Sequence, residues 1–178
     1  LPYMLTNGQK KVISVINQDL KSNLRMFRIL QGDVGSGKTI IAKIVALNSI
    51  ESGYQCGLMA PTSILAEQHF KLLNKLIIDS NLKIKIKLIT GKTDLKERKK
   101  ILQDLENKRI DFLVGTHALF QKKIIFKKLG LTIIDEQHKF GVKQRIDLST
   151  KGGDECDVLL MSATPIPRTM MLSLYGDM

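Results

Sequence analysis

The stretch Gly32–Thr39 constrains this chain more than any other feature. Its sequence, GDVGSGKT, matches the pattern G-x-x-x-x-G-K-[ST] at every fixed position. A strand-like apolar run at residues 26–30 precedes it, and a helix-like run at residues 40–50 follows. The glycines let the backbone turn tightly enough for several N–H groups to point at phosphate oxygens, and the positive end of the following helix faces the same point. The pattern therefore predicts a phosphate-binding loop, and with it a chain that binds a nucleoside triphosphate.

Each residue of this loop has an expected place at the nucleotide. Lys38 is expected to reach the β- and γ-phosphates, and the hydroxyl of Thr39 is expected to bind a magnesium ion, Mg2+. The predicted nucleotide-binding set in the loop is Gly32, Asp33, Val34, Gly35, Ser36, Gly37, Lys38 and Thr39.

Short apolar runs alternate with amphipathic runs along the chain. The strand-like runs are residues 28–30, 55–60, 84–89, 110–115, 131–135 and 158–162, and the helix-like runs are 6–20, 38–51, 65–78, 95–107, 143–148 and one that begins at residue 169. This alternation predicts an α/β fold with a mostly parallel sheet and helices on both faces. Strict alternation of Lys with Ile over residues 83–87 indicates an edge strand whose lysines block edge-to-edge pairing.

The composition fits one domain, residues 1–178. A chain of 178 residues that is 43% hydrophobic can bury one core, and it has no apolar run long enough to span a membrane. Two widely separated cysteines, Cys56 and Cys156, predict reduced thiols in a cytoplasmic protein. The net charge of +11 fits either a polyanionic partner or a lysine-rich surface. Because the chain begins at Leu1 and stops abruptly at Met178, we expect a fragment of a larger protein.

A second chemically active group follows a largely apolar, strand-like run. Residues 131–134 lead directly into Asp135, Glu136, Gln137 and His138. Open α/β sheets build their sites at such strand ends, and two adjacent buried acids are costly without a cation. We expect Asp135 to bind magnesium and Glu136 to orient and deprotonate the attacking water, with His138 close enough to sense the γ-phosphate.

These motifs resemble those of superfamily 2 helicases. Residues 135–138 resemble motif II, residues 162–169 (SATPIPRT) motif III, residues 60–62 motif Ia, residues 90–91 motif Ib and residues 114–117 motif Ic. The resemblance is most detailed to the RecG-type DNA helicases. It is carried by GDVGSGKT, by LAEQH at 65–69, by DEQH followed by FGV at 140–142, and by LSLYGD at 172–177.

The resemblance implies the first RecA-like lobe of an ATP-dependent helicase that remodels forks and Holliday junctions in recombination and repair. In such lobes the motif III strand lies between the phosphate-loop strand and the motif II strand, so Ser162 and Thr164 would lie beside the γ-phosphate. Without the resemblance, a strand end followed by a proline turn is the preferred interpretation of these residues. Thr6 and Gln9 resemble the motif whose Gln reads adenine, and they also form a capping box that starts a helix without any ligand.

The resemblance further implies contacts with DNA phosphates from small or polar residues after the strands. These residues are Pro61, Thr62, Gln68, Thr90, Gly91, Thr116 and His117. His117 could equally be a buried histidine, and His69 is expected to be structural.

The implied partners are branched DNA, a second RecA-like lobe and a wedge domain of the same protein. The second lobe would supply an arginine worth roughly 10³–10⁵ in rate, so the first lobe alone is expected to hydrolyse ATP poorly. Two alternatives stay open. One is a transcription-repair coupling translocase, which usually has Asp-Glu-Glu-His in motif II and a bulkier residue at the position of Ser36. The other is a phosphate-loop kinase or nucleotide switch, for which the chain offers no lid or switch loop.

Overall fold

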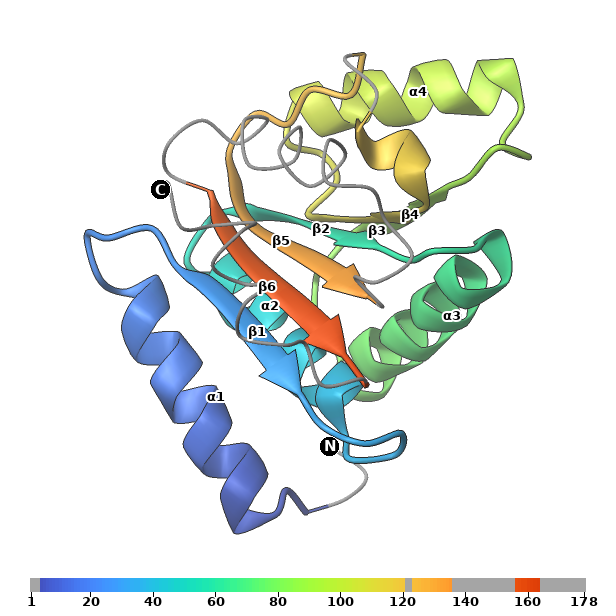
Figure 1. Cartoon of the computed structure of the whole chain (residues 1–178). Helices are drawn as coiled ribbons and strands as arrows, with labels where there is room; N and C mark the ends of the chain where they lie inside the picture. Colours follow the sequence, from blue (N-terminus) through green and yellow to red (C-terminus); the bar gives the residue numbers. More distant parts are fainter. Residues whose placement is uncertain (1–3, 121–122, 136–155, 164–178) are drawn as a thin grey trace, which may run out of the picture.

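The computed structural model of the chain describes residues 4–120, 123–135 and 156–163. In this part of the chain, six strands form one sheet in the order β1-β6-β5-β2-β4-β3, and every neighbouring pair is parallel (Figure 1). The strands are β1 (Phe27–Gln31), β2 (Gln55–Met59), β3 (Ile86–Ile89), β4 (Phe112–Gly115), β5 (Leu129–Asp135) and β6 (Asp157–Ser162). The helices are α1 (Asn7–Leu20), α2 (Lys38–Glu51), α3 (Ser63–Asp79), α4 (Leu95–Glu106) and the short 3-10 helix η1 (His117–Phe120).

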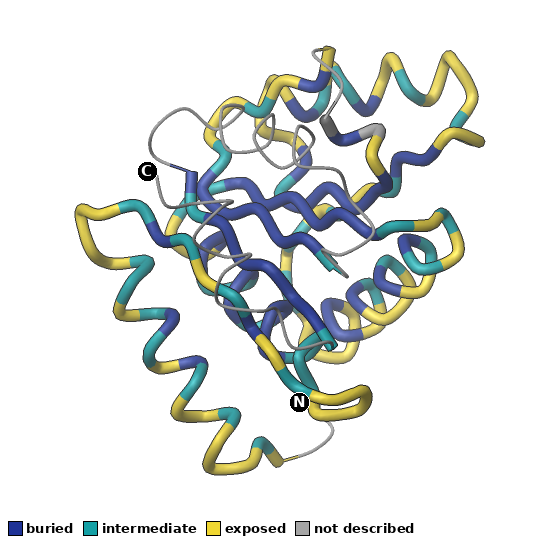
Figure 2. The backbone as a smooth tube through the Cα atoms, viewed as in Figure 1, coloured by how far each residue is buried: buried dark blue, intermediate teal, exposed yellow. Residues whose placement is uncertain are grey.

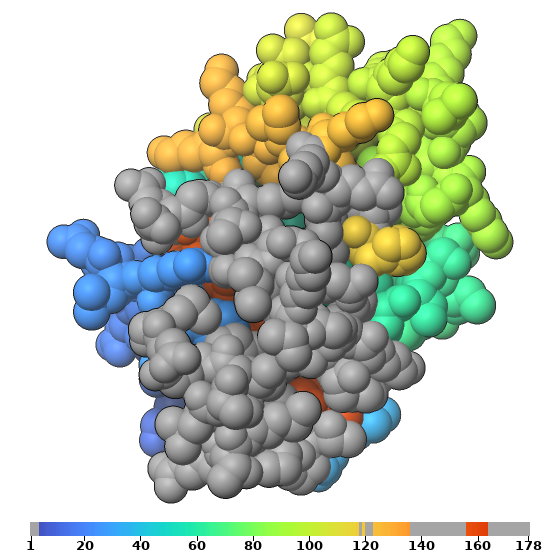
Figure 3. Space-filling view, turned by 45° about the horizontal axis from the view of Figure 1, so that its top comes forward, coloured from blue at the N-terminus to red at the C-terminus, as the bar shows by residue number. Residues whose placement is uncertain are grey.

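Helices cover both faces of the sheet, as predicted. α2 and α3 lie in connections that run across the sheet from β1 towards β3, whereas α4 lies in the connection from β3 to β4, which runs in the opposite direction. Crossovers between parallel strands are right-handed in nearly all proteins, so this reversal moves α4 to the opposite face. In the space-filling view α1 and α4 accordingly occupy different flanks of the molecule (Figure 3).

Two apolar cores lie on the two faces of the sheet. One packs α1, α2 and α3 against strand residues such as Leu58, Ile133 and Leu159, and the other packs α4 against Leu113, Ile134 and similar side chains. The central strands β2, β4, β5 and β6 are therefore buried along almost their whole length (Figure 2). This explains why residues 131–134 are apolar except at Thr132, which is itself buried.

The position of two strands confirms expectations from the sequence. β6, the motif III strand, lies between β1 and β5, and β3 lies at the edge of the sheet. β3 begins two residues later than predicted, because the backbone N–H of Lys85 donates to Oδ2 of Asp111 (2.8 Å). Lys83, Lys85 and Lys87 are exposed, as the alternation indicated.

The helices begin where local chemistry allows. The side chains of Thr6, Thr62 and Asp94 cap α1, α3 and α4 by accepting from a backbone N–H in the first turn. α2 begins instead directly after Gly37, an N-cap residue with a left-handed φ of 88° and no side-chain hydrogen bond to the first turn. The helices predicted at 143–148 and from residue 169 lie outside the described residues. Within the described part, none of the helices is both long and apolar enough to cross a membrane.

Both cysteines are free and buried. Burial raises the pKa of each thiol, that of Cys56 to about 12, and a hydrogen bond with Thr132 only partly offsets this effect on the pKa of Cys156. Both thiols are therefore protonated at neutral pH and are poor nucleophiles.

Candidate functional site

The phosphate loop and Asp135 lie at the same edge of the sheet. Gln31, the last residue of β1, pairs with Ser162 of β6, and the neighbouring Met161 pairs with Asp135 of β5. The carboxyl ends of the three strands are thus level, and two strand spacings separate β1 from β5 by roughly 10 Å. Lys38 and Thr39 begin α2, which packs against β5 and β6. This is the crevice in which open α/β sheets bind ligands.

The glycines of the loop are required by its backbone. Gly35 and Gly37 have φ of 85° and 88°, in the region that other residues rarely adopt. A Cβ on Gly32 would lie 2.8 Å from Oγ of Ser36, so the loop closes tightly at this point. The N–H of Gly32 also donates to the carbonyl of Ser162 (3.3 Å), which ties the loop to the motif III strand.

Lys38 points back into the loop rather than towards bulk solvent. Its ammonium donates to the carbonyls of Gly32 and Asp33, the latter at 2.7 Å. The side chains of Lys38 and Thr39 are half-buried, whereas Val34 at the tip of the loop is 89% exposed. The loop therefore combines an anchored base with a tip open to solvent.

Gln9 joins the first helix to the phosphate loop. Its Oε1 accepts from the N–H of Thr6 (3.0 Å) while Oγ1 of Thr6 accepts from the N–H of Gln9 (3.2 Å), so the predicted capping box is confirmed. The Nε2 of Gln9 donates to the carbonyl of Ser36 (3.1 Å) and lies 2.3 Å from where a Cβ on Gly37 would be. The cap does not exclude adenine recognition, which stays a prediction.

Asp135 has a partner that reasoning from the sequence missed. Nε2 of His69, on α3, lies 2.7 Å from Oδ2 of Asp135, and both side chains are largely buried, with exposures of 8% and 16%. The signal was present in the helix pattern. Ala66, His69, Leu73 and Leu76 form the buried stripe of α3, so the ring of a polar residue had to face the sheet.

Of the remaining predicted catalytic residues, one lies in the described part of the chain and the others lie outside it. Ser162 is 1% exposed at the end of β6, beside the phosphate loop. Glu136, His138 and Thr164 lie outside the described residues, as does Gln137.

The predicted DNA-binding residues lie at the same edge but on the other half of the sheet. They follow β2, β3 and β4, or lie on α3, whereas the nucleotide residues follow β1, β5 and β6. Thr62, Gln68, Gly91 and His117 are exposed, so the alternative of a buried His117 is wrong. Pro61 is half-buried, and Thr90 and Thr116 are buried at 4% and 5% exposure.

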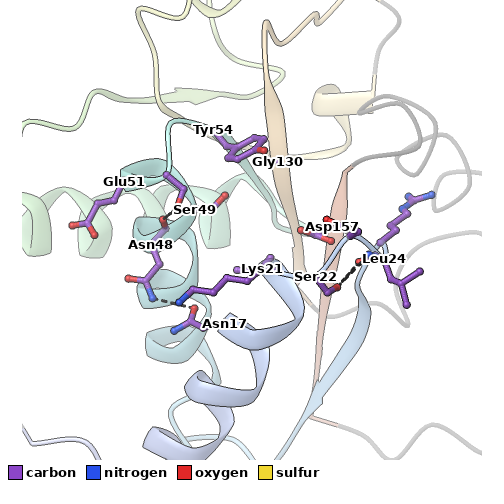
Figure 4. Close-up of a pocket in the computed structure, with 14 residues that line it drawn as sticks. Asn17, Lys21, Ser22, Leu24, Asn48, Ser49, Glu51, Tyr54, Gly130 and Asp157 are labelled. Atoms are coloured by element: carbon purple, nitrogen blue, oxygen red, sulfur yellow. Dashed lines mark hydrogen bonds between the residues drawn. The ribbon is translucent and has the colours of Figure 1, made fainter.

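A second concave region lies at the opposite end of the strands. A cavity of about 730 Å³ is lined by residues such as Asn17 of α1, Lys21 directly after that helix, Asn48 of α2, and Asp157 at the start of β6 (Figure 4). It faces the amino ends of the strands and lies away from the phosphate loop. The loop, Ser162 and Asp135 therefore form the candidate functional site.

The protein groups fit a cation that is held mainly by phosphates. Among the described residues, no three His, Cys, Asp or Glu side chains lie close enough together to form a metal cage. A hydroxyl from Thr39 and one carboxylate from Asp135 are hard oxygen ligands, the kind that Mg2+ takes in small number beside nucleotide phosphates.

Comparison with known proteins identifies this arrangement. The DEAD/DEAH box helicase model matches residues 6–172. The chain is 51% identical over its full length to "ATP-dependent DNA helicase RecG" of Staphylococcus aureus (strain MRSA252) and 50% identical to that of Thermotoga maritima. It covers 25% and 22% of these proteins, so it spans about a quarter of their length.

A solved structure gives the same result for the fold. RecG bound to a three-way DNA junction matches 99% of this chain with a TM-score of 0.84 and 46% sequence identity, over 23% of that protein. The fold is the RecA-like motor fold that the resemblance implied. The six-stranded parallel sheet, its phosphate loop and these matches place the chain in the DEAD/DEAH box helicase family.

Proposed function

We propose that this chain is the ATP-binding first motor lobe of a cytoplasmic helicase that uses ATP to remodel branched DNA in recombination and repair. The observation that carries the proposal is the 46% identity, over 99% of the chain, to a RecG bound to a three-way DNA junction. The common edge that the phosphate loop shares with Asp135 supports it independently. The matches with RecG proteins do not favour a transcription-repair coupling translocase or a kinase.

The chain's own residues account for binding and activation of the triphosphate. The N–H groups of Gly32–Thr39 would surround the phosphates, and Lys38 would exchange its two carbonyl contacts for phosphate oxygens. Gln9, already bonded to Ser36, would read adenine with the remaining N–H and lone pair of its amide. Ser162 and Thr164 would contact the γ-phosphate and respond to its loss.

Thr39 and Asp135 would hold Mg2+, which supplies positive charge to the phosphates when bound. Glu136 would take the proton of the attacking water, and His138 would contact the γ-phosphate. The charge that develops during phosphoryl transfer would be stabilised mostly by these positioned groups, so displacing any one of them would slow the reaction.

Pro61, Thr62, Gln68, Thr90, Gly91, Thr116 and His117 would contact the phosphates of one DNA strand. Their place on the half of the edge opposite the nucleotide supports this role. Contacts with phosphates carry no sequence preference, as a motor that moves along any DNA requires. A second RecA-like lobe and a wedge domain of the native protein would complete the helicase.

The direct test is the substitution K38A in the native protein that carries this chain. Loss of the ammonium should lower DNA-stimulated ATP hydrolysis by about 10²-fold or more and should abolish fork unwinding with it. ATP hydrolysis with and without branched DNA measures the effect. A wild-type protein that hydrolyses ATP without any response to branched DNA would contradict the proposed function.

A second test separates binding from chemistry. E136Q should leave the affinity for ATP close to that of the wild type while hydrolysis stops, because the amide keeps the shape and loses the base. Equilibrium binding of a fluorescent ATP analogue, beside a hydrolysis assay, measures both. Normal turnover by E136Q would remove Glu136 from the role of base.

A further inference from the structure

The pair His69–Asp135 joins a helix to the proposed metal site. His69 lies on α3 in the stripe that packs on the sheet, and its Nε2 reaches Oδ2 of Asp135 at 2.7 Å. In the described part of the chain this is the one hydrogen bond to the Asp135 side chain, so Oδ1 is left for another ligand.

The hydrogen bond also assigns the tautomer of the ring. Nδ1 of His69 is buried and has no hydrogen-bond partner among the described residues. A hydrogen on Nδ1 would therefore be an unpaired buried donor, which is unfavourable. With the hydrogen on Nε2, the ring donates to Asp135 and leaves only a bare acceptor at Nδ1.

A carboxylate at a strand end rotates easily about its last bond, because that torsion has broad minima. The bond from His69 fixes the plane of the Asp135 carboxylate. Outer partners of this kind commonly change metal affinity by about 10–100-fold when they are removed.

We infer that His69 is a positioning residue that orients Asp135 towards Mg2+, an inference that rests on the function proposed above. His69 belongs to the same helix as Gln68 and is seven residues from the cap Thr62. A displacement of α3 by DNA at that end would therefore move the donor that holds the metal-binding carboxylate. A role in packing alone would need the shape of the ring but not its donor.

The experiment compares two variants in the native protein. H69L keeps an apolar side chain in the buried stripe and removes the donor, whereas H69Q keeps an N–H near the place of Nε2. The measurement is the affinity for a fluorescent ATP analogue across a range of Mg2+ concentrations and in EDTA. We expect H69L to raise the half-saturating Mg2+ concentration about tenfold or more and to leave binding in EDTA unchanged. H69Q should behave like the wild type.

Two controls separate the donor from packing. L73V removes a methylene from the same stripe, four residues beyond His69 and eleven beyond Thr62, without touching the donor, and should leave the Mg2+ dependence unchanged. In the D135N background, H69L should add no further loss, because His69 acts through the carboxylate. If H69L fails to fold by circular dichroism, H69M replaces it in the same measurements.

An unchanged Mg2+ dependence in H69L, or an equal loss in H69Q, would overturn the inference. These results leave the proposed function intact as long as the wild type hydrolyses ATP in the presence of branched DNA. Absence of that hydrolysis would instead remove the proposed function itself.

Discussion

At the scale of the single residue, the burial of the Lys43 amine lowers the stability of the folded protein. It is 4% exposed in α2, and burial lowers the pKa of its amine from 10.5 to about 8. The unfolded chain therefore binds more protons than the folded one between about pH 8 and 10.5, so stability rises with pH across that window. K43M should stabilise the protein by roughly 1–3 kcal/mol at pH 7, because Met fills similar space without a charge. Urea denaturation at pH 7 and pH 10.5 measures this, and a gain that does not shrink at the higher pH would contradict it.

Single residues also show what sequence reasoning can reach. That Lys38 and Asp135 lie at the same edge of the sheet could be predicted, because a phosphate loop and a buried acidic strand end each have a fixed place in an open sheet. The contact of His69 with Asp135 spans 66 positions and depends on how α3 packs, which local spacing does not contain. The amide of Gln9 shows the same limit, because its bond to Ser36 is visible only in three dimensions.

At the scale of the element, Thr62, the N-cap residue of α3, has two roles that can be tested separately. Oγ1 of Thr62 accepts from the N–H of Leu65 (3.2 Å), and the same residue is proposed to contact DNA phosphate. T62D should keep the cap, and so the stability of the fold, while its charge lowers DNA affinity by about tenfold or more. T62A should instead cost about 1 kcal/mol of stability, and T62S serves as the neutral control. Thermal denaturation and DNA-binding titrations measure the two effects, and T62D that binds DNA like the wild type would remove Thr62 from the interface.

Elements as a whole could be predicted well, and their ends less well. α2 begins and ends where its pattern predicted, and the phosphate loop fixes its start directly after Gly37. β3 starts later than its alternating pattern, because the side chain of Asp111 takes the N–H that a longer strand would have used. The 3-10 helix η1 was not predicted, since four residues after a strand carry no periodic signal.

At the scale of the whole molecule, the net charge of +11 need not serve DNA binding everywhere. Lys83, Lys85 and Lys87 are exposed along the edge of the sheet at β3, where unpaired backbone groups can pair with another chain. We expect the triple substitution K83T/K85T/K87T to increase self-association, because Thr favours strands and no longer repels a second edge.

The same variant tests whether this edge contacts DNA. If the lysines only protect the edge, the slope of the logarithm of DNA affinity against the logarithm of salt concentration should stay that of the wild type. Each lost phosphate contact would instead reduce the magnitude of that slope by about 0.7–0.9. Sedimentation velocity measures the association, and salt titrations of DNA binding measure the slope. A variant in which all three positions become Arg keeps the charge and should match the wild type in both assays. A shallower slope without self-association would assign these lysines to the DNA instead, and the positive charge of the molecule would then extend from the strand ends along its outer edge.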